Sequence, residues 1–243
     1  MKIINLSSSE RCRVAERVLA SCELKNTKTK GLILLPVPTS RDGEHISGTD
    51  RYISDIPPIV CSGDLVVGYG FSSELCSLIR ERGGDTLDLL LDEGFIYRNN
   101  ELTAHATLGY ILSERGRDIT DTRIGVIGYG RLGASLLRLL LFLGSSVTVF
   151  SGSTDKRVAL AGEGVSCLDY SEIENTPFDV LINTAPDKFL TRAPDAGLFL
   201  DLASGNLYSA LGAVFLPSLP EKRYPISAGK TYAKAVIDYC NLH

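Results

Sequence analysis

The sequence has few of the residues that build metal centres and disulfide frameworks. It contains three histidines in 243 residues, and its six cysteines form no C-x-x-C pair; they stand at positions 12, 22, 61, 76, 167 and 240. Scattered cysteines in a chain of this length exclude a small disulfide-stapled domain and give no spacing typical of zinc ligands. We therefore expect neither disulfides nor a metal site.

Long apolar runs and an excess of positive charge are also missing. No run approaches the ~20 uncharged apolar residues of a membrane span, and the apolar run at the N-terminus is shorter than the core of a signal peptide. Lysine and arginine number 25 against 29 aspartates and glutamates, which gives no electrostatic footprint for nucleic acid or an anionic membrane. We expect a protein of the reducing cytoplasm that binds neither nucleic acid nor membrane.

Short runs of valine, isoleucine and leucine alternate with longer stretches of helical spacing. This alternation is typical of parallel sheets joined by crossover helices. Hydrophobic residues make up 44% of the chain, which is enough for a sizeable core. We predict the α/β class with two doubly wound parallel-sheet domains. Strands are expected at residues 2–6, 31–37, 64–67, 86–90, 123–127, 146–150, 179–183, 198–202 and 213–216.

A glycine-rich turn lies between the strand at residues 123–127 and a helix expected over residues 134–143. Its sequence fits the dinucleotide-binding fingerprint: Gly128-Tyr129-Gly130-Arg131-Leu132-Gly133. The first glycine permits a tight turn, the second lets the backbone approach a pyrophosphate, and the third lets helix and strand pack closely. The helix N-terminus offers N–H groups to the anion. We predict that these six residues bind a nicotinamide dinucleotide in a Rossmann domain; a turn without a ligand is the alternative.

The residue after the next strand helps to distinguish NADP from NAD. NAD enzymes place a carboxylate there to hold the ribose hydroxyls, but this chain has Ser151. The nearby Gly152, Ser153 and Lys156 provide a loop with hydroxyl and ammonium donors, which suits a 2′-phosphate. The sequence therefore favours NADP, with NAD less favoured. The alternative is that Lys156 and Arg157 only begin the next helix as a solvated face.

A gap in the strand pattern predicts the boundary between two domains. Residues 102–113 carry their apolar side chains on one helical face, and Gly116 marks the end of this linking helix. We expect residues 1–98 to form a flavodoxin-like substrate domain that is completed by a C-terminal helix over residues 228–243. Residues 99–227 are expected to form the linking helix and the Rossmann domain.

The first domain contains a weaker copy of the glycine turn. Gly68-Tyr69-Gly70 follows an expected strand, but Ser73 stands where the third glycine would allow close helix packing. A lone G-x-G after a strand is weak evidence for a ligand. We interpret Gly68 and Gly70 as shaping a turn, and any site there as belonging to substrate.

Two later strand ends should border the cofactor crevice, because ligands of open α/β sheets sit at the carboxyl ends of strands. The residues concerned are Asn183, Thr184, Ala185 and Pro186 after one strand, and Ala203 and Ser204 after another. Loop capping by Asn183 and Thr184 is the alternative. Asp201, a lone carboxylate at a strand end, is more typical of a turn cap than of a catalytic group.

Hydride chemistry also needs a group that moves a proton and groups that hold a carboxylated substrate. The catalytic candidates are His105, which can act as acid or base near neutral pH, and the basic pair Lys222 and Arg223. The candidates for substrate binding are Thr39, Arg41 and Thr103. The ordinary alternatives are an exposed helical histidine, a solvated loop arginine and a solvated turn.

Several short segments, taken in order, resemble the first subunit of dipicolinate synthase. They are Ile33-Leu-Leu-Pro36, Ile96-Tyr97-x-Asn99, the glycine turn, Ile182-Asn183-Thr184-x-Pro186, Asp201-Leu-Ala-Ser204 and Leu216-Pro217-x-Leu219-Pro220. The resemblance implies an NADP-dependent, cytoplasmic oxidation of a dihydrodipicolinate-like cyclic dicarboxylate, in a sporulation-related family. It also implies that the partner is a small flavoprotein-like second subunit, and it leaves a homo-oligomer open.

The chain departs from this family in two loops. The family continues after Ser204 with a Pro-Gly-Gly run, whereas this chain has Gly205-Asn206-Leu207-Tyr208, and the family's Pro-Gly-Leu-Pro-Gly is Pro-Ser-Leu-Pro-Glu at residues 217–221. Side chains in place of glycines reshape a loop that approaches a ligand. Two alternatives therefore stay open: a non-catalytic nucleotide-binding relative or scaffold, and a dehydrogenase of another small carboxylic acid.

Overall fold

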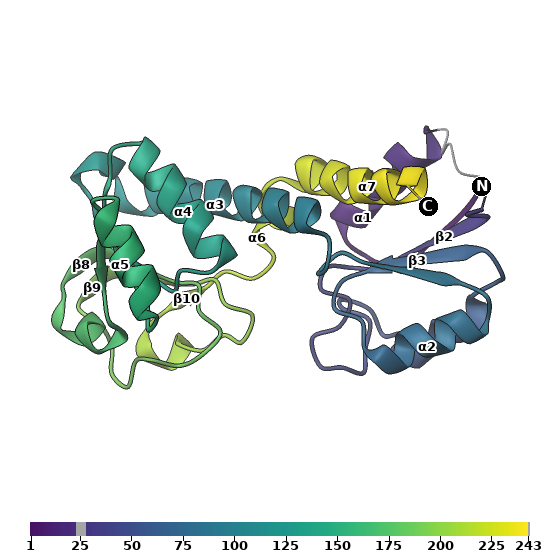
Figure 1. The fold of residues 1–243 in the computed structure, drawn as a ribbon, viewed down its shortest axis with the longest axis horizontal. Coiled ribbons are helices and arrows are strands. Elements are labelled where there is room, and N and C mark those ends of the chain that lie inside the picture. Colours follow the sequence, from purple (N-terminus) through teal and green to yellow (C-terminus); the bar gives the residue numbers. More distant parts are fainter. Residues whose placement is uncertain (23–27, 243) are drawn as a thin grey trace. The chain divides into compact units, whose positions relative to one another are not determined.

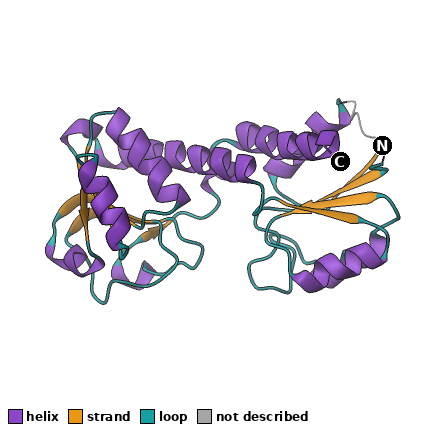
Figure 2. Cartoon of the chain, in the orientation of Figure 1, coloured by secondary structure: helices purple, strands orange, loops and turns teal. Residues whose placement is uncertain are grey.

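The structure is a computed structural model that describes residues 1–22 and 28–242. In it the chain forms two compact units. The first unit holds Met1–Leu102 and the segment that starts at Pro220, and the second holds Thr103–Leu219. Residues 99–102 and 220–227, which the sequence assigned to the second domain, thus belong to the first. Each unit is built on one all-parallel sheet, so the predicted α/β class is confirmed (Figures 1 and 2).

The first unit contains a four-stranded sheet in the order β1-β2-β3-β4. Helices α1 (Glu10–Ala20) and α7 (Pro225–Leu242) cover one face of this sheet, and α2 (Ser73–Glu81) covers the other (Figure 1). In a flavodoxin-like sheet the first strand lies inside, whereas β1 is at the edge here, so the strand order of this sheet differs from that of the flavodoxin-like domain expected from the sequence. The strands are Lys2–Asn5 (β1), Gly31–Leu34 (β2), Asp64–Gly68 (β3) and Asp85–Asp88 (β4).

A glycine and a tyrosine fix α7 on the first sheet. A Cβ on Gly229 would overlap the side chain of Val14 on α1, so glycine lets the two helices pack this closely. The buried Tyr232 hydroxyl lies 3.1 Å from the carbonyl oxygen of Leu35 and 2.9 Å from that of Val67. The predicted C-terminal helix is therefore present and begins three residues earlier than expected; its last predicted residue, 243, lies outside the described part.

The second unit contains a six-stranded sheet in the order β10-β9-β8-β5-β6-β7. This is the strand order of Rossmann domains, which reverses between β5 and β8. The predicted Rossmann domain is confirmed as a fold; β7 was not predicted because Ser166-Cys167-Leu168 contains no run of valine, isoleucine or leucine. The strands are Arg123–Ile127 (β5), Ser146–Phe150 (β6), Ser166–Leu168 (β7), Phe178–Asn183 (β8), Ala196–Asp201 (β9) and Val214–Phe215 (β10).

Helix α3 (Glu93–Arg115) is longer than the predicted linking helix, which was expected to begin at residue 102. The missed signal is Asp92, whose carboxylate accepts a hydrogen bond of 2.7 Å from the backbone N–H of Phe95 and so caps the first turn. The segment Ile96-Tyr97-x-Asn99, placed before the helix by the sequence, therefore lies inside it.

The remaining helical segments connect these elements. Helices α4 (Arg131–Phe142) and α5 (Thr154–Gly162) belong to the second unit, and α6 (Leu219–Arg223) is short. Short 3₁₀ helices cover Ile53–Asp55, Pro57–Ile59, Ile119–Asp121, Tyr170–Asn175 and Ser209–Leu211. In the part of the chain that the structure describes, no helix has both the length and the apolar character needed to cross a membrane.

Candidate functional site

The glycine turn between β5 and α4 is shaped by contacts that exclude side chains at two positions. Gly128 has a φ of +96°, and a Cβ there would lie 2.9 Å from the Thr184 hydroxyl. A Cβ on Gly133 would overlap the carbonyl oxygen of Gly128. Both glycines are therefore required by the fold of the turn itself, as expected for a fingerprint turn.

Gly130 differs from its two neighbours because steric crowding does not explain it. It is the N-cap residue of α4, and a Cβ there would meet open space among the described residues. A glycine cap brings no side chain to the first turn, so the N–H groups of the helix end face outward, where an anion is stabilised. This geometry suits the close approach of a phosphate to the backbone.

The turn sits at the place where the sheet reverses its strand order. Strand β5 pairs with β6 on one side and with β8 on the other. Thr184, the first residue after β8, donates a hydrogen bond of 2.9 Å from its hydroxyl to the carbonyl oxygen of Ile127. The ends of β5 and β8 are thus tied together at the crevice where open α/β sheets bind ligands.

The loop after β6 lies against the glycine turn through one lysine. Lys156, in the first turn of α5, donates from Nζ to the carbonyl oxygen of Tyr129 over 3.0 Å. Ser151 is buried, and its hydroxyl accepts from the backbone N–H of Ser153. The structure therefore brings together the turn and the residues that the sequence assigned to the 2′-phosphate.

The two cations of this loop have different surroundings. Arg157 forms an ion pair of 2.8 Å with Asp169, at the end of β7, and also donates to the carbonyl oxygen of Ser151. Lys156 forms no ion pair with any described side chain. Hydrogen bonds from Ser171, with the charge of Arg157 as a weaker cause, hold the pKa of Asp169 below its ordinary value. Lys156 is therefore the cation left for a phosphate.

An aromatic pair packs against the loop after β6. The rings of Tyr170 and Phe189 are stacked, with centroids 3.7 Å apart and planes 19° from parallel. A Cβ on Gly152 would lie 3.2 Å from the Tyr170 ring, so the loop after β6 packs against it. The sequence did not point to either aromatic residue, because their partnership joins loops that are distant in the chain.

The buried side chains after β8 and β9 hold loops. The Asn183 amide donates to the Asp201 carboxylate over 2.8 Å, and both residues are fully buried. The Asp201 carboxylate also accepts from the backbone N–H groups of Ala203 (3.1 Å) and Leu207 (2.7 Å). The interpretation of Asp201 as a turn cap is therefore confirmed. The Asn183 side chain also caps its loop, because its oxygen accepts from the backbone N–H of Ala185, as the alternative for this residue predicted. Of the other residues assigned to this border, Ala185 and Ala203 are buried, whereas Pro186 and Ser204 are exposed.

The loop that departs from the family pattern is anchored by Tyr208. Its ring is fully buried and lies 5.5 Å from the ring of Phe199. Its hydroxyl accepts from the backbone N–H of Phe189 over 2.6 Å. The loop after β9 thus holds the loop after β8 with a side chain where the resemblance predicts a glycine run.

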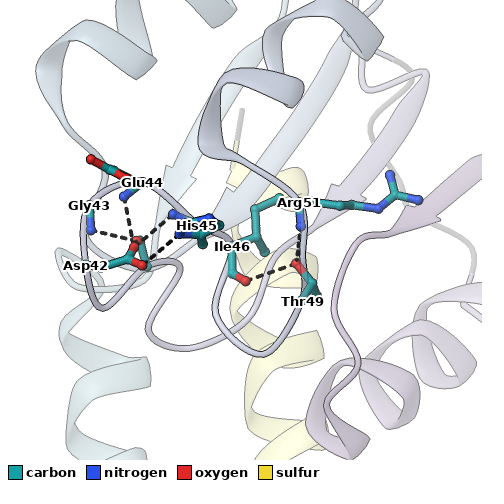
Figure 3. A network of polar contacts seen from close by, with 8 residues as sticks. Asp42, Gly43, Glu44, His45, Ile46, Thr49 and Arg51 are labelled. Atoms are coloured by element: carbon teal, nitrogen blue, oxygen red, sulfur yellow. Dashed lines mark hydrogen bonds and ion pairs between the residues drawn. The ribbon is translucent and has the colours of Figure 1, made fainter.

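The candidates of the first unit occupy two kinds of environment. The Thr39 hydroxyl is buried and accepts from the backbone N–H of Tyr69 over 2.7 Å, so it ties two strand ends together. Arg41 is exposed beside a tight polar loop, shown in Figure 3. In this loop Asp42 accepts from the backbone N–H groups of His45 and Glu44 and from the His45 ring, which holds the pKa of Asp42 well below its ordinary value.

The glycine turn of the first unit is filled from within. The Asp88 carboxylate accepts from the backbone N–H groups of Gly70 (2.8 Å) and Phe71 (2.9 Å). A Cβ on Gly68 would lie 2.6 Å from the ring of Phe71, which is too close for two carbon atoms. Glycine at this position therefore lets the Phe71 ring pack against the backbone. The interpretation of Gly68 and Gly70 as residues that shape a turn is confirmed.

The catalytic candidates do not form a cluster within either unit. His105 is exposed on α3, and it belongs with Thr103 to the second unit. Lys222 and Arg223 are exposed at the end of α6 and belong to the first unit. Among the described residues, no group of three or more His, Cys, Asp or Glu side chains is placed to hold a metal ion.

Solved structures share the fold of the whole chain. A dipicolinate synthase chain from Bacillus subtilis has a TM-score of 0.75 at 19% identity, over 98% of this chain and 95% of that one. The corresponding dipicolinate synthase chain from Bacillus halodurans has a TM-score of 0.72 at 17% identity, over 99% and 97%. D-lactate dehydrogenase from Escherichia coli has a TM-score of 0.53 at 12% identity, over 100% and 96%.

These similarities confirm the resemblance at the level of the fold. No protein-family model matches the sequence, and no curated protein matches it either. At 12–19% identity, likeness of structure says which architecture the chain adopts, because one fold hosts many chemistries. The function must therefore be argued from the site.

Proposed function

We propose that this protein is an NADP-dependent oxidoreductase that resembles the first subunit of dipicolinate synthase and holds its dinucleotide in the second unit. The observation that carries the proposal is the glycine-capped N-terminus of α4 at the reversal of the sheet, with Lys156 bonded to the Tyr129 carbonyl oxygen beside it. An anion-binding helix end, and a cation that forms no ion pair with a described side chain, then serve two phosphate groups of one ligand.

The residues fit NADP in an order set by the sheet. The turn from Gly128 to Gly133 faces the pyrophosphate, and Ser151, Ser153 and Lys156 face the 2′-phosphate. The loops at residues 183–186 and 203–204 border the nicotinamide through exposed atoms and backbone, because the buried side chains there are already hydrogen bonded. The bound cofactor would supply the hydride acceptor, and the protein would position it and exclude water.

For the substrate, we propose a dihydrodipicolinate-like cyclic dicarboxylate that binds the first unit. Support comes from the fold shared with the dipicolinate synthase chains over nearly their whole length. Thr39, Arg41 and Thr103 stay candidates for substrate contact, and His105, Lys222 and Arg223 for proton transfer. A homo-oligomer, a cytoplasmic location and a flavoprotein-like second subunit stay predictions as well.

One observation favours a second candidate function. The buried Tyr208 fills the loop where the resemblance predicts glycines, so the approach of a ligand to this backbone differs from that in the family. A nucleotide-binding relative without a reaction, acting as a sensor or scaffold, accounts for this change. A dehydrogenase of another small carboxylic acid accounts for it equally. The similarity of this chain's fold to that of D-lactate dehydrogenase supports this option.

Calorimetric titration of the purified protein with NADP, NADPH, NAD and NADH tests the proposal. We expect saturable binding of the phosphorylated pair at least tenfold tighter than binding of the other pair. The exposed Lys30, in the first unit, provides a matched control: Lys30→Ala should bind as the wild type does. Absence of binding by all four nucleotides would refute the proposal. Binding followed by no turnover over a broad dicarboxylate panel would favour the sensor.

A further inference from the structure

Helix α1 carries an arginine on its buried face. Arg11 lies in the first turn, after the N-cap residue Ser9, and only 2% of its surface is exposed. Arginine is almost never buried to this degree unless it is paired. The sequence signal is a charged residue in line with the apolar Ala15 and Val18 at helical spacing, and the candidates named from the sequence did not include it.

The guanidinium of Arg11 is incompletely hydrogen bonded. Its Nη2 donates to the side-chain oxygen of Asn99 on α3 over 3.2 Å. Its Nε and Nη1 are buried and have no hydrogen-bond partner among the described residues. No acidic side chain of residues 1–22 or 28–242 forms an ion pair with it. Buried charged donors without acceptors are costly, so a native site with such donors requires an explanation.

The groups around Arg11 do not supply the missing acceptor. The Tyr232 hydroxyl is engaged with backbone oxygens of Leu35 and Val67, and the Cys12 thiol is engaged with the carbonyl oxygen of Leu35. Burial lowers the pKa of Arg11, and the charge of Glu221 on α6 acts in the opposite direction. Glu221 therefore compensates the charge through space without satisfying the N–H groups.

We propose that Arg11 is the anchor for the carboxylate group of a small organic acid bound by the first unit. Asn99 fixes the guanidinium, Nε and Nη1 donate to the carboxylate, and the N-terminus of α1 adds a favourable potential for an anion. The proposal deepens the proposed function, on which it rests for the role of the first unit as substrate domain. It adds a residue that none of the sequence candidates included.

The probe is pyridine-2,6-dicarboxylate, titrated without nucleotide, with the uncharged pyridine-2,6-dicarboxamide as its matched control. Because Arg11 is closed to solvent, its neighbours must move to admit an anion, and binding is read after equilibration. We expect the dicarboxylate to raise Tm and to bind at least tenfold tighter than the diamide. Equal behaviour of the two probes would overturn the proposal.

Two variants of α1 assign the binding to Arg11. Arg11→Met and Arg11→Lys should each weaken dicarboxylate binding at least tenfold. Arg17→Met removes an exposed arginine that pairs with Glu10 on the same helix, and it should bind as the wild type does. Wild-type affinity in Arg11→Lys would overturn the proposal even if Arg11→Met does not fold.

The melting temperature of unliganded Arg11→Met distinguishes an anchor for a ligand from a purely structural arginine. If Nε and Nη1 have no acceptor until a ligand binds, unliganded Arg11→Met removes two buried donors without acceptors and should melt at or above the wild-type Tm. A lower Tm would show that the protein itself satisfies the guanidinium, and would overturn the proposal. NADPH titration of the same variants keeps the two proposals apart, because the dinucleotide residues lie in the other unit and should bind unchanged.

Discussion

Lys156 and Tyr129 are 27 residues apart in sequence, and the Lys156 ammonium donates to the Tyr129 carbonyl oxygen over 3.0 Å. The contact joins the start of α5 to the glycine turn, so the ammonium is held beside the expected phosphates. In the structure this cation is bound by a neutral carbonyl group. A phosphate is a stronger acceptor for it than the carbonyl oxygen is.

Lys156→Ala should therefore reduce selectivity for NADP. Loss of one charge-assisted hydrogen bond is worth about a tenfold change in affinity or somewhat more. We expect NADPH to bind about tenfold more weakly, while NADH binding changes less than threefold. Calorimetry on the variant and on Lys30→Ala measures both ratios. An equal loss for the two nucleotides would show that Lys156 shapes the loop and does not read the 2′-phosphate.

Replacement of glycine by alanine should have different effects at two positions of the turn before α4. Gly133→Ala places a methyl group on the Gly128 carbonyl oxygen, so it should destabilise the fold by roughly 1–3 kcal/mol and weaken nucleotide binding. Gly130→Ala places its methyl group in open space, so stability should change by less than about 1 kcal/mol. Urea unfolding measures both changes.

Nucleotide titration of the Gly130 variant gives the decisive comparison. If a pyrophosphate approaches the backbone at this residue, Gly130→Ala should bind NADPH more weakly although its fold is intact. Unchanged affinity would contradict the placement of the pyrophosphate.

Removal of the Asp201 carboxylate should destabilise the second unit. Asp201→Ala leaves the Asn183 amide and the backbone N–H groups of Ala203, Leu207 and Tyr208 without the carboxylate that accepts from them. Each buried donor left unpaired costs about 1–3 kcal/mol, which makes this one of the most damaging single substitutions in the domain. The exposed Asp187 provides the control, since Asp187→Ala should leave the urea midpoint nearly unchanged. A mild effect of Asp201→Ala would mean that water replaces the carboxylate.

Asp179 should make stability depend on pH in the acid range. Hydrogen bonding to Arg123 and the nearby charge of Arg115 hold the pKa of Asp179 below its ordinary value. A lowered folded-state pKa means that the ionised carboxylate stabilises the folded protein. That contribution is complete above the unfolded pKa of about 3.9 and is lost as the pH falls through the lower, folded value.

Asp179→Asn should therefore lower stability at neutral pH and flatten the loss of stability below about pH 4. Urea midpoints between pH 2.5 and 7 measure the slope. Parallel curves for the variant and the wild type would contradict the assignment of this acid dependence to Asp179.

Tyr208 should control the order of the loop after β8. Tyr208→Phe removes the hydroxyl that accepts from the Phe189 N–H and lies 3.3 Å from the Asp187 carbonyl oxygen. We expect a loss of about 1 kcal/mol and faster hydrogen exchange at Phe189. Exchange at Ile182, inside β8, should change little. Unaltered protection at Phe189 would show that packing alone holds this loop.

The elements that the sequence predicted well are those with local signals. Apolar runs located nine of the ten strands of the described residues, and the spacing of the glycines located the turn before α4. The start of α3 was missed because its signal is one capping aspartate, Asp92, before a first turn that contains the poor helix former Gly94. Strand β7 was missed because Ser166-Cys167-Leu168 contains no run of valine, isoleucine or leucine.

The site was less predictable where it depends on contacts between distant segments. The sequence identified Lys156 by its place after a strand, but the bond to Tyr129 follows from the folded sheet. The place of Thr39 after a strand predicts a ligand contact, but the structure shows its hydroxyl bonded to the backbone of Tyr69, 30 residues away. Arg11 gave only a weak signal, since a single arginine near a helix start is usually solvated.

The carboxylate of Asp88 in the turn of the first unit behaves as a tethered ligand. It accepts hydrogen bonds from the Gly70 and Phe71 amides as a free anion would. Because the carboxylate is part of the chain, its effective concentration is fixed and it cannot diffuse away. The turn before α4 begins with a glycine that brings no such group. The first unit of this protein therefore carries a permanently occupied version of the turn that, in the proposed function, the second unit keeps open for a dissociable ligand.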